Sequence, residues 1–292
     1  MTNKILFIIN PISGIGKQKS VEKNIKKYLD KNKYQSEIIY TKYAKHAIEI
    51  SSKAANNYKI IVAVGGDGSV NEVSRGLINS DTALAIIPAG SGNGLARHLK
   101  IPLKIIGAIK NINNGTCKEI DIIKLNEEFF VNVAGVGFDA HISHLFAEYG
   151  KRGRISYIKL INKEFINYQP QKYSIIIDEK EYIREAFLLS LANSSQFGNN
   201  AHISPMAKVD DGLIDLCILK KFPFYKTPDL AQKLFFKTID KSKYIEIIKT
   251  KKLIIRNKEL LKVHIDGEPI TIKDDLNINV LQGALKVIVP CN

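Results

Sequence analysis

The stretch Ile60–Val73, IIVAVGGDGSVNEV, joins an apolar strand pattern to a glycine-rich loop and a helical pattern. Glycines that follow a buried strand let a phosphate approach the backbone amides. The carboxylate of Asp67 in this loop would repel a phosphate unless a cation lay between them, and Mg²⁺ is often held by one or two carboxylates with phosphate oxygens. The stretch therefore predicts a site for a nucleoside triphosphate with Mg²⁺. Capping of the following helix is the alternative role for Asp67.

Two further loops of the same character follow strands in the first half of the chain. They are INPISGIGK, Ile9–Lys17, and PAGSGNGLAR, Pro88–Arg97. The first is not a P-loop, because Pro11 stands where the first glycine would be and Gln18 follows the lysine. In a parallel sheet, ligands bind beyond the carboxyl ends of the strands. Three such loops at one edge favour a nucleotide site over ordinary turns.

The chain changes its hydrophobic period near residue 121. Before it, apolar strands at 4–9, 36–40, 60–64 and 82–87 alternate with helical patterns at 16–32, 44–55 and 69–78, which is typical of a parallel sheet covered on both faces. After it, strand-like segments and turns such as DDG, IDGEP and LQG dominate, with helical patterns at 143–167 and 228–248. We predict an α/β nucleotide-binding domain over 1–121. A mostly antiparallel β-sandwich or open barrel is predicted over 122–292, and its extreme C-terminus could pack back on the first domain.

Composition narrows the setting and the partners. The 292 residues carry a net charge of +14 and include three scattered cysteines without a CxxC pair. No apolar run approaches the roughly 18 residues of a membrane span, and the N-terminus lacks a signal-peptide pattern. These features predict a cytoplasmic protein with an anionic partner. An RNP, KH or zinc pattern is missing from the sequence, so an anionic membrane face is favoured over nucleic acid.

Six segments together give the chain a family resemblance. NPISG, GGDGSVNEV and IPAGSGNGLAR, followed by FFVNVAGVGFDA, SPMAKVDDGLIDLCIL and VHIDGEPI, resemble the diacylglycerol kinase catalytic-domain family. That family includes bacterial soluble diacylglycerol kinases and sphingosine-kinase-like lipid kinases. The resemblance implies an α/β domain followed by a β-sandwich, with the active site in the cleft between them. A glycine loop like GGDG alone would be weak evidence, since 6-phosphofructokinases and NAD kinases have similar loops.

The resemblance implies which residues line an ATP site. Serine at 69 and at 91 replaces the family's frequent threonine and keeps the hydroxyl, while NGLAR replaces NDFAR and loses an acid at Gly94. That loss bears on lipid specificity rather than on ATP. The implied ATP-site residues are Asn10, Pro11, Ile12, Ser13, Gly14, Thr41, Gly66, Asp67, Gly68, Ser69, Val70, Asn71, Glu72 and Ser91.

Two sites in the second half follow from the same resemblance. Phosphorylation of a hydroxyl needs a positioned acceptor for its proton, and the family's general base corresponds to Glu268, with Asp266 beside it. A solvated hairpin turn is the plain alternative for this stretch. The segment KVDDGLID resembles the family's structural magnesium site, formed by the Asp211 carboxylate and the backbone oxygens of Lys208 and Leu213. From the residues alone it would be a tight turn.

The expected activity is transfer of the γ-phosphoryl group of Mg·ATP to a lipid hydroxyl, with diacylglycerol giving phosphatidic acid. The alternatives are a sphingoid base, a soluble polar alcohol as in NAD kinases, or a sensor that binds without turnover. Retention of Asp67, Asp266 and Glu268 argues against the sensor. Aromatic residues among lysines in Lys220–Lys237 either touch a membrane or belong to the core. The lipid substrate at an anionic membrane surface is the expected partner, and homodimerisation is left open.

Overall fold

The computed structural model describes residues 3–12, 18–148 and 154–291. By its internal contacts, the chain divides into two units. The first unit comprises residues 1–122 and 281–292, and the second comprises 123–280. Two strands, β5 (Thr116–Leu125) and β18 (Leu276–Val289), contribute residues to both.

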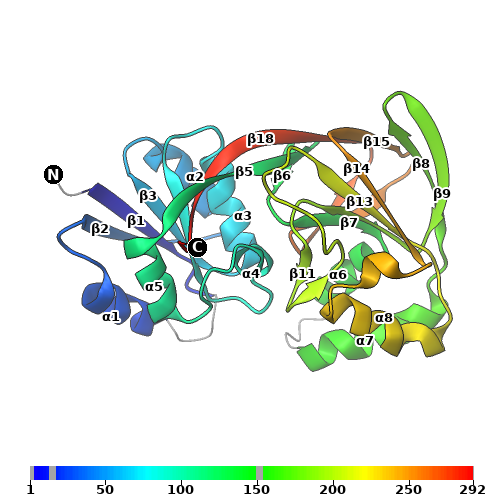
Figure 1. Cartoon of the computed structure of the whole chain (residues 1–292), viewed down its shortest axis with the longest axis horizontal. Coiled ribbons are helices and arrows are strands. Elements are labelled where there is room, and N and C mark those ends of the chain that lie inside the picture. Colours follow the sequence, from blue (N-terminus) through cyan, green and yellow to red (C-terminus); the bar gives the residue numbers. More distant parts are fainter. Residues whose placement is uncertain (1–2, 13–17, 149–153, 292) are drawn as a thin grey trace. The chain divides into compact units, whose positions relative to one another are not determined.

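The first unit is built on a parallel sheet with the order β2-β1-β3-β4-β18. Helices α1 and α5 bury residues such as Val21 and Ile109 against one face, and α2 packs on α3 (Figure 1). All six residues of β3 and of β4 are buried, because both faces of these strands are covered. The elements of this unit, besides β5 and β18, are β1 (Asn3–Ile9), α1 (Gln18–Tyr28), β2 (Tyr34–Tyr40), α2 (His46–Ala54), β3 (Ile60–Gly65), α3 (Asp67–Gly76), β4 (Ala83–Pro88), α4 (Gly94–His98) and α5 (Ile105–Asn114).

The second unit is a sandwich of antiparallel sheets. One sheet has the order β14-β13-β10-β7-β16-β17, and the other includes β18-β15-β8-β9. Leu189 and Leu216 of the first sheet and Ile175 and Ile255 of the second share one buried core. The predicted fold class, an α/β domain followed by a β-sandwich domain, is therefore confirmed.

In the part of the second unit that the structure describes, three α-helices and short strands complete the fold. A separate core forms where Phe138, Phe165 and Leu230 of the helices meet Phe187 beside the sheet. None of the helices in the described residues is long and apolar enough to cross a bilayer. The elements are β6 (Glu128–Phe130), β7 (Val133–Gly137), α6 (Phe138–Glu148), α7 (Arg154–Asn167), β8 (Gln171–Ile177), β9 (Lys180–Ala186), β10 (Leu188–Ala192), β11 (Gln196–Gly198), β12 (Ala201–His202), β13 (Ile214–Leu219), α8 (Thr227–Phe235), β14 (Ile245–Thr250), β15 (Lys252–Arg256), β16 (Leu261–Ile265) and β17 (Glu268–Ile272), with 3₁₀ turns at Phe224–Lys226 and Ile239–Lys241.

Candidate active site

The predicted nucleotide loops of the first unit meet at one edge of its sheet. Strands β1, β2, β3 and β4 are parallel, so their carboxyl ends coincide. Backbone hydrogen bonds continue the ladder into the loops: the Asn10 amide donates to the Val64 carbonyl at 3.2 Å, and the Thr41 amide donates to the Ile9 carbonyl at 2.9 Å. This is the edge at which open parallel sheets bind ligands.

Asn10 links the first loop to the second. Its Nδ2 donates to Ser69 Oγ at 3.3 Å, and its Oδ1 accepts from the Ile12 amide at 3.0 Å. Pro11 and Ile12 are exposed. Ser13 and Gly14, also predicted to line the site, lie outside the described residues. The Asn10 side chain thus fixes the start of the first loop against the helix that follows β3.

The second and third loops touch through their glycines. A Cβ added at Gly90 would lie 2.4 Å from the Cα of Gly66, and one added at Gly66 would lie 3.2 Å from the Cα of Gly90. The first of these distances is shorter than real side chains tolerate, so glycine at position 90 is required by this contact. Both glycines are half-buried, and the absence of side chains at these positions is what lets the two loop backbones approach each other.

Asp67 fastens the same two loops together. One carboxylate oxygen accepts from the Asn93 amide at 2.8 Å and the other from the Gly94 amide at 2.7 Å. Asp67 is itself the first residue of α3, whose N-cap is Gly66. The alternative predicted from sequence, that Asp67 is the N-cap of the following helix, is therefore wrong, because Gly66 occupies that position. The carboxylate binds amides at the start of α4, about 26 residues further along the chain.

The charge of Asp67 is held in a partly buried setting. Burial raises the pKa of its carboxyl above the ordinary value, and the amide bonds from Gly94 and Asn93 and the nearby Arg97 guanidinium oppose part of that rise. Each carboxylate oxygen has two lone-pair sites, so the amide bonds leave acceptor capacity for a cation or a water.

Asn93 and Arg97 hold the third loop in shape, and sequence reasoning missed the role of Asn93. Asn93 has a left-handed backbone with φ 51°. Its side chain both accepts from the Gly90 amide at 3.1 Å and donates to the Gly90 carbonyl at 2.9 Å. Arg97 Nε donates to the Gly92 carbonyl at 3.0 Å. An asparagine in a glycine-rich turn was the available signal, because asparagine tolerates φ above zero.

The other predicted nucleotide residues divide into accessible and structural ones. Gly68 and Ser69 are half-buried and Ser91 is exposed, so a ligand could reach them. The Glu72 carboxylate instead accepts from the amides of Lys45 and Ala47, at 3.0 and 3.1 Å, at the start of α2. The buried residues Val70 and Asn71 complete the predicted set.

In the second unit, the two carboxylates of the IDGE stretch lie in different environments. Asp266 is 8% exposed and has a left-handed φ of 48°. Its carboxylate accepts from the amides of Val131, Asn132 and Val133, at 3.2, 3.0 and 2.9 Å. Glu268 begins β17 and is exposed. Asp266 therefore tethers a loop, whereas the carboxylate of Glu268 is accessible.

Helix α6 packs on the hairpin that carries Glu268. Ser143 Oγ donates to the Gly267 carbonyl at 3.0 Å, and His144 Nε2 lies 2.9 Å from the Ile270 carbonyl. Asp139 at the start of α6 contacts His264 Nε2 at 3.0 Å. Through these contacts α6 holds both strands of the β16–β17 hairpin.

Comparisons with known proteins identify the family of this chain. Residues 4–125 match the model described as "Diacylglycerol kinase catalytic domain", and residues 132–289 match "YegS C-terminal NAD kinase beta sandwich-like domain". The second match alone covers more than half of the chain. The chain belongs to the diacylglycerol kinase and YegS-like lipid kinase family. The predicted resemblance is thereby confirmed, and a kinase of this family uses ATP.

Individual relatives align with most of this chain. "Diacylglycerol kinase" of Bacillus subtilis is 28% identical over 271 residues, covering 90% of this chain and 88% of its own. "Probable lipid kinase YegS-like" of Chromohalobacter salexigens is 29% identical over 236 residues, covering 79% and 76%. The solved structure "A putative diacylglycerol kinase from Bacillus anthracis str. Sterne" matches with a TM-score of 0.81 at 28% identity, covering 98% of this chain and 97% of the other.

The residues around Asp211 are those of the metal site that the family resemblance implies. One Asp211 oxygen accepts from the Leu213 amide at 3.1 Å, and the other lies 3.4 Å from Lys249 Nζ. Lys249 also contacts Asp215 at 2.9 Å. In the described ranges, no group of three or more His, Cys, Asp and Glu side chains is placed to hold a metal. One carboxylate with backbone oxygens is still a ligand set that Mg²⁺ accepts. The residues therefore fit the ion, and a bound ion would share the Asp211 carboxylate with the Lys249 ammonium.

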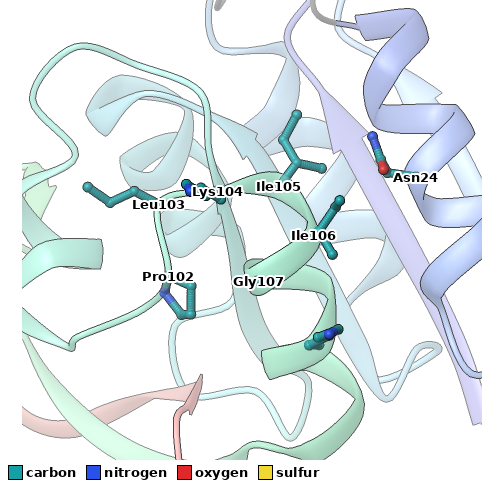
Figure 2. A pocket seen from close by; sticks show the side chains of 8 residues that line it. Asn24, Pro102, Leu103, Lys104, Ile105, Ile106 and Gly107 are labelled. Atoms are coloured by element: carbon teal, nitrogen blue, oxygen red, sulfur yellow. The ribbon is translucent and has the colours of Figure 1, made fainter.

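An apolar depression of about 630 Å³ lies elsewhere on the first unit of this kinase. It is lined from α1 and from the start of α5, with Leu103 and Ile106 at its surface (Figure 2). None of the predicted nucleotide residues that the structure describes lines it. The candidate site is therefore carried by the loops at the sheet edge rather than by this depression.

Proposed function

We propose that this protein transfers the γ-phosphoryl group of ATP to the hydroxyl of diacylglycerol, giving phosphatidic acid and ADP. One observation carries the proposal: the Gly66–Gly90 contact and the Asp67 bridge hold two glycine loops together at the carboxyl edge of the parallel sheet. Backbone amides in such loops suit phosphate oxygens. Membership of a lipid kinase family supports a lipid acceptor.

The nucleotide would be bound by main chain and small polar side chains. Gly68, Ser69 and Ser91 are accessible at the loop edge, and Asn10 and Thr41 follow the neighbouring strands. Amide and hydroxyl donors aimed at phosphate oxygens stabilise the charge that moves during transfer. Glu72 supports the proposal indirectly, since it fixes α2 to α3 beside this edge.

The general base in this proposal is Glu268. It is exposed at the start of β17, on a hairpin that Ser143 and His144 hold in place. An accessible carboxylate can accept the proton that the acceptor hydroxyl loses. The Asp266 carboxylate is buried and already accepts hydrogen bonds from three backbone amides, so it is less accessible to an acceptor hydroxyl than Glu268 is.

Magnesium has two proposed places in this enzyme. Asp67 would hold the ion that accompanies the nucleotide, and Asp211, with the backbone oxygens of Lys208 and Leu213, would hold a structural ion. When bound with ATP, the ion neutralises phosphate charge. The residues themselves position the loops: Asp67 joins the second to the third, and Asp211 closes its own turn.

The test is phosphoryl transfer from labelled ATP to a panel of acceptors. The panel contains diacylglycerol, monoacylglycerol, sphingosine, undecaprenol and NAD, and NAD is included because the second-unit match is described as NAD kinase-like. We expect labelled phosphatidic acid with the wild type and a loss of about 10²–10⁴ in kcat with Glu268→Gln. Label on another acceptor alone would move the proposal to that substrate. ATP binding with no labelled product from any acceptor would indicate a sensor.

A further inference from the structure

The second unit exposes a group of aromatic side chains around α8. Phe224 is 50% exposed, Tyr225 75%, Phe235 52% and Phe236 71%. All the exposed phenylalanines of the described residues lie in the segment Phe224–Phe236. Large apolar side chains are usually scattered singly when they are exposed, and a contiguous group indicates an interaction site.

The packing beneath this segment turns the aromatic side chains outward. Phe222 and Leu230 are buried in the core formed with Phe138 and Phe187, so the segment is anchored from below. Within α8, the exposed positions 228, 229, 232 and 235 lie along one outer stripe of the helix. The exposed Tyr225 belongs to the 3₁₀ turn directly before α8, and the exposed Phe236 directly follows its last residue.

Contacts with the end of α7 fix the segment further. Lys221 Nζ donates to the carbonyls of Phe165 and Tyr168, each at 2.6 Å, and lies 4.7 Å from the centre of the Phe165 ring. The Phe224 ring lies 5.7 Å from the Phe165 ring. α7 and α8 lie on the same side of the second unit (Figure 1). The exposed aromatic residues thus belong to a packed element rather than to a loose loop.

Positive charge is concentrated in and around this segment. Residues 220–243 contain seven lysines and two aspartates, a net charge of +5, whereas the whole chain of 292 residues carries +14. An even distribution of the net charge would give a segment of this length about +1. Asp229 contacts Lys233 at 3.1 Å, so one of the two acids is already paired. The partner of this face must accept both aromatic side chains and positive charge.

We propose that the α8 face, defined as Phe224, Tyr225, Phe235 and Phe236 with Lys220, Lys226 and Lys237, docks this kinase on the surface of an anionic lipid bilayer. The inference rests on the proposed lipid acceptor, which resides in such a surface. Aromatic rings occupy the headgroup boundary, and lysines reach anionic headgroups from apolar surroundings. Charge complementarity therefore selects the anionic bilayer.

The experiment is co-sedimentation of the full chain with vesicles of phosphatidylglycerol and, separately, of phosphatidylcholine. The aromatic variant is Phe235→Ser with Phe236→Ser. Its matched control is Leu260→Ser, at a side chain 67% exposed elsewhere in the same unit. The charge variant changes Lys220, Lys226 and Lys237 to Gln. Its control changes Lys251, Lys252 and Lys258, three exposed lysines elsewhere in the same unit, to Gln.

We expect the wild type to bind phosphatidylglycerol vesicles and to lose binding near 0.5 M salt, roughly where screening becomes short-ranged. The aromatic variant should bind at least about tenfold more weakly. The charge variant should bind weaker by roughly fivefold for each lysine, the fold-change that corresponds to the usual gain near an anionic surface. Both controls should bind as the wild type does. All variants should keep the wild-type melting temperature, because the changed side chains are exposed or, at Lys226, half-buried at the surface.

Three results would overturn the docking face: no vesicle binding by the wild type, equal binding to both lipids, or unchanged binding of the α8-face variants. Turnover of a dispersed short-chain diacylglycerol, which needs no vesicle, distinguishes a failure of the docking face from a failure of the proposed kinase activity. If the aromatic variant loses vesicle binding but keeps that turnover, docking and function both stand. If the wild type binds vesicles through the α8 face but phosphorylates no lipid, the proposed function fails and the docking face remains.

Discussion

Replacing each carboxylate of the Ile265–Glu268 stretch by its amide should separate folding from chemistry. In Asp266→Asn, one side-chain oxygen remains to accept from the Asn132 and Val133 amides, which both bind Oδ1 at present. The new NH₂ group would face the Val131 amide, so two donors would meet in a buried place. In Glu268→Gln, the changed group is exposed.

The size of the effect on stability follows from these bonds. A hydrogen bond to a charged group contributes about 1.5–3 kcal/mol, a neutral one about 1 kcal/mol, and a buried donor without an acceptor costs about 1–3 kcal/mol. Two weakened bonds and one donor left without an acceptor at Asp266 give a loss of about 2–7 kcal/mol. At about 2–4 °C per kcal/mol for a unit of this size, the melting temperature should fall on the order of 10 °C. Glu268→Gln should change stability by less than about 0.5 kcal/mol.

The assay pairs a thermal melt with labelled-ATP turnover at a temperature where both variants are folded. Asp266→Asn should melt early and keep measurable kcat, whereas Glu268→Gln should melt normally and lose a factor of about 10²–10⁴ in kcat. The reasoning is refuted if Asp266→Asn melts like the wild type while its turnover is abolished. It is also refuted if Glu268→Gln retains normal kcat, since the base would then be another group.

Three further variants test the other carboxylates and one histidine. Asp67→Asn should abolish turnover and also cost about 1–3 kcal/mol, because one of the two loop amides loses its acceptor; a normal kcat at saturating Mg·ATP would contradict the role of Asp67. Lys249→Met should enlarge the rise in melting temperature that Mg²⁺ produces without ATP, since the ammonium no longer shares Asp211; a melt insensitive to Mg²⁺ in both proteins would count against the second ion. Burial and the charge of Lys237 lower the pKa of His202, so the unfolded chain binds a proton near pH 6.5 that the folded chain does not, and stability should fall as pH drops below that value. In urea unfolding at pH 7.5 and 5.5, His202→Gln should reduce this difference, and an unchanged difference would show that His202 does not cause it.

The sequence predicted the core strands of the first unit well because burial dominates there. The strand predicted at 60–64 is β3, Ile60–Gly65, and the strand predicted at 82–87 is β4, Ala83–Pro88. Each is a run of almost entirely apolar residues covered on both faces. Local pattern and tertiary environment agree at these positions, so the sequence alone was sufficient.

Where the two disagreed, the prediction was wrong. The helical pattern at 228–248 ends in the structure at Phe235, and Ile245–Thr250 is the edge strand β14, paired with β13. The LQG stretch, predicted to be a turn, lies inside β18, where the Gly283 amide donates to the buried carboxylate of Asp121 at 2.8 Å. These outcomes depend on partners that are distant in the sequence. Helix α5 was missed because glycine and β-branched residues weaken its helical signal.

The candidate site shows why a motif identifies residues better than it identifies their roles. Asp67 and Asp266 were both chosen as chemical groups, yet each carboxylate accepts hydrogen bonds from backbone amides far along the chain. A loss of turnover in Asp67→Asn therefore has two possible causes, a lost cation ligand and a displaced loop. They differ in one observable: a displaced loop weakens ATP binding even without Mg²⁺, whereas a lost ligand weakens only the Mg²⁺-dependent part. Nucleotide affinity measured with and without Mg²⁺ is thus the measurement that assigns the role of Asp67.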